Sequence, residues 1–240
     1  MKLLSELGAN WLDAVALALF VTAWFGYASF ADRHGRSVPS LHTQMDRFRR
    51  EWMTRMIERD NRMVDVGIMR VLARSSQFFA STTMLVLGAL IALTGYIQQA
   101  LDVVSGLPFT VKGSARLLEV KILLLVVIFT YAFFKFSWSM RQLGQASTLI
   151  GAAPPKPPNN PEQHAPWINR IAMVTSYAGT NFNNGLRAYY FGLAALAWFL
   201  HPWLMIVATA WVIWVLYARE FKSKTLAAML EEDSSPTMRT

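Results

Sequence analysis

The feature that most constrains this chain is an arginine-rich stretch between two apolar runs of membrane-spanning length. Residues 32–77 hold ten of the sixteen arginines and no lysine. Residues 11–30 precede this stretch and residues 78–97 follow it, and each run has about the 20 residues that a ~30 Å hydrocarbon core requires. Because cytoplasmic loops of membrane proteins carry an excess of Lys and Arg, the stretch predicts which end of each run faces the cytoplasm.

Composition supports the same class of protein. Apolar residues make up 54% of the chain and come in runs, which predicts a single all-α integral membrane domain over residues 1–240. We expect a bundle of about five transmembrane helices, with four as the alternative, together with amphipathic cytoplasmic helices. The net charge of +8 would suit nucleic acid, but the basic residues cluster beside apolar runs. We therefore expect membrane lipid and no nucleic acid as partner.

The five-span prediction depends on one His-Pro pair. A proline at 202 would either kink one long helix or end a tight hairpin, with Trp198 and Trp203 as interfacial belt residues. A single span would leave Arg219, Lys222 and Lys224 outside the cell, against the charge bias. We therefore predict an external N-terminus, a cytoplasmic C-terminus and spans near 11–30, 78–97, 117–138, 187–200 and 203–219. The first run exceeds a signal-peptide core and is interrupted by Asp13, so we expect it to be retained.

The cytoplasmic segment 32–77 carries a helical pattern. Ser40 is a predicted N-cap, and Asp60-Asn61 is a predicted break. Apolar residues recur at helical spacing: Met45, Phe48, Trp52, Met56, Val64, Ile68 and Val71. Opposite charges four apart (Asp46–Arg50, Arg47–Glu51, Glu51–Arg55, Glu58–Arg62) indicate a solvated face, with an anionic lipid surface as the alternative. We expect the apolar stripe to pack on a second cytoplasmic helix, 167–182, or on a neighbouring subunit.

Two further segments complete the predicted organisation. The sequence GAAPPKPPNNP lies in a proline-rich loop, 151–166, because prolines favour extended conformations over helix. Residues 231–240 form a polar tail that we expect to be flexible.

Charged residues near span ends give a first candidate site. Asp13, near the start of the first span, and Lys121, near the start of the third, are predicted at similar depth and predict an intramembrane pair, with Glu119 as a second candidate partner. The alternative is that Asp13 reaches the outer interface alone.

A second candidate site is a polar vestibule at the inner side. Gly185 is a predicted helix break there, and the alternative is a capped helix end with interfacial tyrosines and a snorkelling lysine. The predicted vestibule residues are Asn181, Asn183, Asn184, Arg187, Tyr189, Tyr190, Ser81, Thr82, Thr83 and Lys135.

Small residues on the second span predict close helix contact. Ala80, Gly88 and Ala92 fall on one stripe, where a partner helix can approach closely. This stripe is one reason to expect a homo-oligomer.

The sequence offers little for catalysis. It has no cysteine, and His34, His42, His164 and His201 show no ligand spacing. No nucleotide-binding glycine loop or nucleophile motif is present. We therefore expect neither an enzyme nor a metal or cofactor.

Several blocks resemble a known family. They are SLHTQMDRFRREWMTRM with RDNRMVD, FFASTTMLVLGAL, LLEVKILLLVVIFTYAFFKFSWSMRQ, NFNNGLRAYYFGLAALAWF and YAREFKSKT. Together they resemble the bacterial inner-membrane family known as domain of unknown function 599. The resemblance implies a multi-pass protein of the inner membrane and implies no activity, cofactor or catalytic residue.

Two functions fit these observations. The first is a non-enzymatic oligomeric channel or solute-conducting assembly, because five helices enclose little space alone and symmetry would create an axis. The second is an accessory or scaffold subunit that docks a larger complex through its arginine-rich cytoplasmic face.

Overall fold

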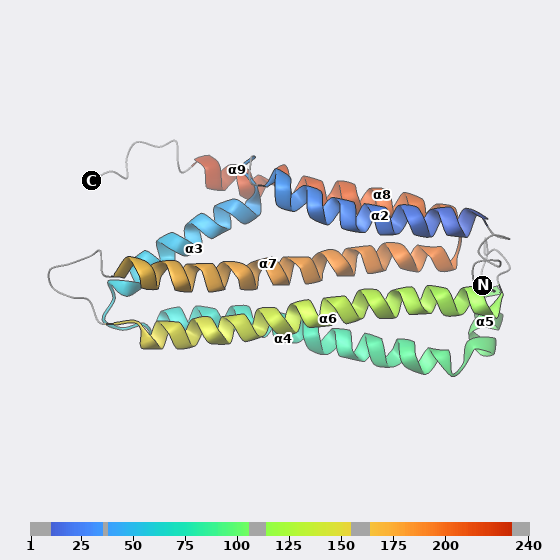
Figure 1. Cartoon of the computed structure of the whole chain (residues 1–240), viewed down its shortest axis with the longest axis horizontal. Helices are drawn as coiled ribbons and strands as arrows, with labels where there is room; N and C mark the ends of the chain where they lie inside the picture. Colours follow the sequence, from blue (N-terminus) through green and yellow to red (C-terminus); the bar gives the residue numbers. More distant parts are fainter. Residues whose placement is uncertain (1–10, 36–37, 106–113, 155–163, 232–240) are drawn as a thin grey trace. The chain divides into compact units, whose positions relative to one another are not determined.

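A computed structural model describes residues 11–35, 38–105, 114–154 and 164–231, and the regular structure of these residues is helical throughout. Figure 1 labels the elements in chain order. They are α2 (Trp11–His34), α3 (Leu41–Ile57), α4 (Met63–Thr94), α5 (Ile97–Ser105), α6 (Ala115–Ala152), α7 (Ala165–Leu196), the 3₁₀ turn η2 (Ala197–Phe199), α8 (Pro202–Phe221) and α9 (Lys224–Glu231). The tail 232–240 and most of the proline-rich loop lie outside the described residues.

Four helical segments are long and apolar enough to cross a membrane. They are Trp11–Ala31, Met63–Thr94, Ala115–Ala152 and Pro202–Glu231. The prediction of an all-α membrane protein is therefore confirmed. Residues 187–200, predicted as a further span, lie mainly in α7, outside these four segments. The choice between four and five spans stays a prediction.

The chain divides into two compact units. Unit 1 comprises Met1–Asp32, Ser81–Phe133 and Gly185–Leu216, and unit 2 comprises Arg33–Ala80, Phe134–Asn184 and Tyr217–Thr240. Unit 1 has five basic and five acidic residues. The other eighteen basic and ten acidic residues belong to unit 2, which therefore carries the whole net charge of +8.

The long helices are apolar on their exposed faces. On α4 the buried face includes Asp65, Met69 and Ser76, whereas Val64 is 67% exposed and Val71 65% exposed. Val64, Ile68 and Val71 therefore do not pack within the chain, and their packing on a neighbouring subunit stays a prediction. Exposed apolar residues of this kind are suited to contact with another chain or with lipid.

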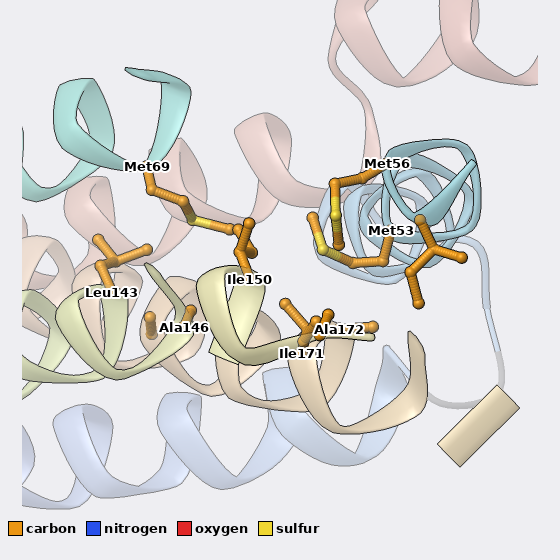
Figure 2. Packing of buried hydrophobic residues seen from close by; sticks show 11 residues of the cluster. Met53, Met56, Met69, Leu143, Ala146, Ile150, Ile171 and Ala172 are labelled. Carbon is orange, nitrogen blue, oxygen red and sulfur yellow. The ribbon is translucent and has the colours of Figure 1, made fainter. Parts of the chain in front are cut away.

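Unit 2 has a methionine-rich core that joins four helices. Figure 2 shows Met53 and Met56 of α3 and Met69 of α4 in one cluster with side chains from α6 and α7. The α6 and α7 members include Leu143, Ala146, Ile150, Ile171 and Ala172. The predicted packing of the 32–77 segment on the 167–182 region is confirmed. Flexible methionines fill irregular space between such helices well.

Local signals explain where α3 begins and ends. The Ser40 side chain accepts a hydrogen bond from the Thr43 backbone N–H at 3.2 Å, and the Thr43 hydroxyl accepts from the Ser40 backbone at 2.9 Å. This reciprocal cap confirms the predicted N-cap. The helix ends at Ile57 and α4 starts at Met63, so the predicted break at Asp60-Asn61 is also confirmed.

The predicted ion pairs on α3 form only in part. Arg55 pairs with Glu51 as expected. Asp46 pairs instead with Arg49, one position closer than the predicted Arg50. Arg62 turns away from Glu58 and binds backbone carbonyls at the end of α6. Burial of the guanidinium groups against other helices competes with pairing along the α3 surface.

The chain reverses between α7 and α8 within unit 1 (Figure 1). The α8 helix begins with Pro202, whose missing N–H costs nothing at a first helical position. The ring Nδ1 of His201 accepts a hydrogen bond from the Trp203 backbone N–H at 3.1 Å and caps the new helix. The α7 helix itself runs unbroken through Gly185, so the predicted break there is wrong.

The unit 2 core predicts that replacing a buried methionine lowers protein stability, whereas replacing an exposed one does not. Met53 is fully buried, whereas Met63 is 78% exposed. Met53→Ala should destabilise the protein by about 2–5 kcal/mol, because it removes packed atoms and leaves a cavity. Met63→Ala is the matched control and should leave the thermal midpoint in neutral detergent, followed by circular dichroism, nearly unchanged. Equal effects of the two changes would contradict the packing described for unit 2.

Candidate functional site

Trp198 joins the two charged groups of the predicted outer pair in unit 1. Its indole Nε1–H donates to Asp13 Oδ1 at 2.6 Å. Lys121 Nζ donates to the Trp198 backbone carbonyl at 2.8 Å and lies 5.4 Å from the centroid of its ring. Both Trp198 and Asp13 are buried. The tryptophan therefore supplies a hydrogen bond to the carboxylate and both a carbonyl and a ring face to the ammonium group.

The structure brings Asp13 and Lys121 to one place, but through Trp198. Within the described residues the two groups form no ion pair shorter than 4 Å, and Glu119 is exposed and takes no part. Trp198 was predicted at an interface and is instead fully buried, whereas Trp203 is 57% exposed. The sequence feature that accompanies this contact is a tryptophan shortly before the His201-Pro202 turn, and its indole N–H reaches Asp13 on α2.

The predicted inner vestibule is divided among several contacts. In unit 1 the Thr83 and Tyr189 hydroxyls lie 2.8 Å apart, and the Arg187 Cζ atom lies 5.8 Å from the Tyr27 ring centroid. Ser81 is exposed, while Thr82 and Tyr190 are half-buried. These residues hold α4, α7 and α2 to one another.

Other predicted vestibule residues lie in unit 2. Lys135 Nζ donates to Asn181 Oδ1 at 3.1 Å, and Asn181 Nδ2 donates to Gln142 Oε1 at 2.9 Å. Asn183 Nδ2 lies 3.5 Å from His42 Nδ1, and Asn184 is half-buried on α7. The asparagines therefore act in the middle of a continuous helix, where they bind side chains of α6 and α3 rather than cap a helix end.

Arg49 lies flat on α7 where that helix carries a glycine. Its side chain is 16% exposed, and its Nη1 donates to Asp46 Oδ1 at 2.6 Å. A Cβ atom at Gly179 would lie only 2.5 Å from Arg49 Nη2. The glycine therefore makes room for the guanidinium group between α3 and α7.

His42 completes this contact between α3 and α7. Its Nε2 lies 3.1 Å from Thr180 Oγ1, and the Thr180 hydroxyl proton is donated to the Ser176 carbonyl at 3.0 Å. His42 Nε2 must therefore carry the proton, and His42 Nδ1 accepts from the Asn183 amide. Asp46 Oδ2 lies 3.6 Å from the same Nε2.

A small polar pocket in unit 2 adjoins these residues. The Arg49 pocket has a volume of about 160 Å³, and its polar lining comes from Arg49, Ser75, Ser76, Ser139, Thr175 and Asn183. Ser139 donates to the Ala178 carbonyl at 2.8 Å, so it must accept from Ser76 at 3.1 Å. Thr175 donates to the Ile171 carbonyl at 2.7 Å. Since these hydroxyl protons are in use, the groups that can donate to a solute are Arg49 and Asn183.

The size of the Arg49 pocket limits what it can hold. At ~30 Å³ for each water molecule of the liquid, it would take a handful of waters or one solute of similar size. Sequence reasoning named only Asn183 of its polar residues, because the others come from the cytoplasmic segment 32–77, the amphipathic helix 167–182 and the end of the third predicted span. The closest signal was the pair Ser75-Ser76 within an apolar helix.

A buried carboxylate that sequence reasoning missed lies at the start of α4. Asp65 is fully buried, and its Oδ1 accepts from Trp52 Nε1 and from Arg59 Nη1, both at 2.7 Å. Arg59 is the counter-ion that a buried carboxylate requires. The sequence feature that could have indicated this site is Asp65 itself, an aspartate among apolar residues shortly after the break at Asp60-Asn61.

The described residues contain no group of three or more His, Asp or Glu side chains that could hold a metal ion. His201 caps α8, and the His34 ring packs on Phe221 with centroids 5.2 Å apart. The histidines therefore occupy separate structural positions.

Outward-facing small residues occur on two helices. Of the predicted stripe, Ala80 is buried, whereas Gly88 and Ala92 are exposed, and a Cβ added at Gly88 would meet no atom within 4 Å. The α2 helix has a similar stripe that sequence reasoning did not identify. It consists of the exposed residues Ala18, Thr22, Gly26 and Ser29, with open space beside Gly26.

Comparison with known proteins identifies the family. The chain belongs to the family described as "Protein of unknown function, DUF599", which matches residues 15–225. The match begins in α2 and ends in α9, so both units contribute to it. No curated protein and no solved structure matches the chain. The resemblance found in the sequence is confirmed, and its function has to be argued from the residues.

The contacts among Asp13, Lys121 and Trp198 predict that loss of the indole N–H group lowers the stability of the protein. Trp198→Phe keeps most of the ring but leaves the Asp13 carboxylate without its indole donor, which should cost about 1–3 kcal/mol. Trp203→Phe is the control, because that ring is exposed. Thermal unfolding in detergent should show a lower midpoint for the first variant alone. If both variants unfold like wild type, Asp13 does not depend on Trp198.

Proposed function

We propose that this protein is a non-enzymatic multi-pass membrane protein that assembles as a homo-oligomer and conducts small polar solutes or ions. The Arg49 pocket is the observation that carries the proposal. The Arg49 guanidinium group lies against Gly179 of α7. Arg49 and Asn183 line the pocket and can donate hydrogen bonds to a solute. Such a site suits recognition of a small solute rather than covalent chemistry.

The outward-facing stripes support assembly. Helix surfaces that face lipid have no need of small or hydroxyl-bearing residues, whereas close contact between helices favours them. The stripe Ala18, Thr22, Gly26 and Ser29 on α2 offers such a surface to a second copy, and Gly88 and Ala92 on α4 offer another. Two different surfaces on one chain favour a closed ring, with an axis where polar side chains can gather.

The distribution of charge supports an orientation of the chain in the membrane with its basic segments in the cytoplasm. The chain passes between unit 1 and unit 2 five times, beginning in unit 1 and ending in unit 2. Because unit 2 carries the whole positive charge, the positive-inside rule favours unit 2 at the cytoplasmic side of a bacterial inner membrane. We propose five crossings, with the N-terminus outside and the C-terminus inside, because this topology puts the basic segments of unit 2 on the cytoplasmic side.

The same charge supports a second candidate function. A unit with eighteen basic residues and an exposed apolar stripe on α4 also suits a subunit that docks a larger complex. Co-purification of other chains in fixed ratio would favour docking, whereas solute flux through vesicles that contain this chain alone would favour conduction.

Gly179→Ala tests the Arg49 pocket without removing its polar groups. The added methyl group must displace the Arg49 guanidinium, while the helix itself gains an alanine. Flux of urea and of potassium chloride into proteoliposomes, followed by light scattering, should fall about tenfold for the transported solute, equivalent to ~1.4 kcal/mol.

The matched control for this experiment is Gly144→Ala. It lies on α6 in unit 2, where an added Cβ meets no atom within 4 Å, and it should retain wild-type flux. No flux above protein-free vesicles for wild type would contradict conduction. Unchanged flux in Gly179→Ala would exclude the pocket from the pathway.

Gly26→Leu tests the assembly surface on α2. The bulky side chain fits the open space around one copy but prevents close approach of a second helix. We expect the oligomer measured by light scattering in detergent to dissociate at least in part, with the monomer still folded. Phe25→Leu, an adjacent exposed position, is the control and should assemble normally. A wild-type protein that is already monomeric would contradict this part of the proposal.

A further inference from the structure

An open groove in unit 2 lies beside the start of α4 and the end of α6. It has a volume of about 570 Å³ and shares no residue with the Arg49 pocket. Its charged lining consists of Arg59, Arg62 and Arg70 with Asp60. Met63, Val66, Ile150 and Ala153 contribute an apolar wall. We call it the arginine groove.

Two of its arginines are held in place by the fold. Arg62 Nη1 donates to the Ala153 carbonyl at 2.6 Å, and its Nη2 donates to the Pro154 carbonyl at 2.9 Å. This contact caps the end of α6 with a positive charge and leaves part of the guanidinium group unused. Arg59 is fixed by its bond to Asp65 and likewise keeps further N–H donors.

Arg70 is the third arginine and has a different role. It is exposed and forms no hydrogen bond or ion pair within the described part of the chain. It lies seven residues after Met63, two turns along α4, and so on the same side of the helix. Nothing in the fold requires a charge there, since neither a carboxylate nor a helix end is neutralised by it.

Two acidic residues nearby cancel part of this charge and leave a net charge of +1. Asp65 is fully buried behind the groove and its Oδ1 is occupied by Trp52 and Arg59, while Asp60 lies exposed on the lining. The groove lies between the N-terminal end of α4, whose dipole favours an anion, and the C-terminal end of α6, whose opposing dipole is met by the Arg62 guanidinium group. Guanidinium groups bind phosphate through paired hydrogen bonds, which a single ammonium group cannot provide.

We propose that the arginine groove binds a phosphate ester. The three guanidinium groups would take the phosphate, and the wall of Met63, Val66 and Ile150 would take an apolar or aromatic substituent. The volume lies within the ~300–1,000 Å³ typical of small-molecule sites and exceeds what a bare phosphate fills. This inference stands independently of the conduction proposed above.

The position of the groove favours a soluble ester over a bilayer lipid. Val66 lies twelve residues before Phe78, where the second predicted span begins. At 1.5 Å per residue this is ~18 Å along α4, so a span that begins at Phe78 leaves the groove beyond the headgroups of the adjacent leaflet. Both sources share the same phosphate chemistry, and the experiment separates them.

Calorimetric titration of the full chain in neutral maltoside detergent tests the proposal. The probes are phenyl phosphate, inorganic phosphate and dihexanoyl phosphatidic acid below its micelle concentration. The variant is Arg70→Gln, which removes the arginine that has no structural partner. Arg74→Gln is the matched control, because it removes an exposed positive charge one turn further along α4, outside the groove.

We expect phenyl phosphate to bind wild type and Arg74→Gln alike, and to bind Arg70→Gln about tenfold more weakly, as the loss of a charge-assisted hydrogen bond commonly produces. The same variant pattern with dihexanoyl phosphatidic acid alone would support the site and assign it to lipid. Absence of binding by all three probes would overturn the proposal, and so would equal weakening in both variants. Inorganic phosphate that binds as tightly as both esters would overturn the role of the apolar wall.

Discussion

The constraint on which this structure depends is that polar groups of the long helices must be satisfied inside the protein. Lipid offers no hydrogen bonds, so a polar side chain facing it would lose its partners. The α2 helix buries Asp13 while exposing Val15 and Phe25. The indole N–H of Trp198 and the paired hydroxyls of Thr83 and Tyr189 are bonds of this kind. These hydrogen bonds determine which helix faces meet in unit 1, because each buried polar group needs a partner on a neighbouring helix.

Unit 2 meets a different demand. It concentrates eighteen basic residues, and the fold uses several of them as structural parts. Arg49 lies across Gly179, Arg59 neutralises the buried Asp65, and Arg62 caps the end of α6. The guanidinium group suits these positions because its planar set of donors can bind several acceptors at once. The arginine-rich segment therefore helps to determine how α3, α4, α6 and α7 meet in unit 2.

Sequence reasoning succeeded where a local signal or the solvent decides the outcome. The N-cap at Ser40, the break after Ile57 and the family resemblance all follow from residues adjacent in the chain. It failed where the same residue pattern is compatible with two different structural environments. Val64, Ile68 and Val71 have the spacing of a core stripe, but a face that is exposed in the single chain can have the same spacing. Gly185 resembled a helix break, yet packing carries α7 through it. The partners of Trp198 and Arg49 are too distant in sequence for spacing to reveal.

The proposal of five crossings, with the N-terminus outside and the C-terminus inside, can be tested by labelling single cysteines. The absence of cysteine allows single cysteines to be labelled without background. Gln99, Arg55 and Thr225 are exposed positions on α5, α3 and α9. In intact spheroplasts a membrane-impermeant maleimide should label Gln99→Cys, whereas Arg55→Cys and Thr225→Cys should react only after permeabilisation. Labelling of Thr225→Cys from outside would show four crossings and contradict the account, as would labelling of Gln99→Cys and Arg55→Cys from the same side.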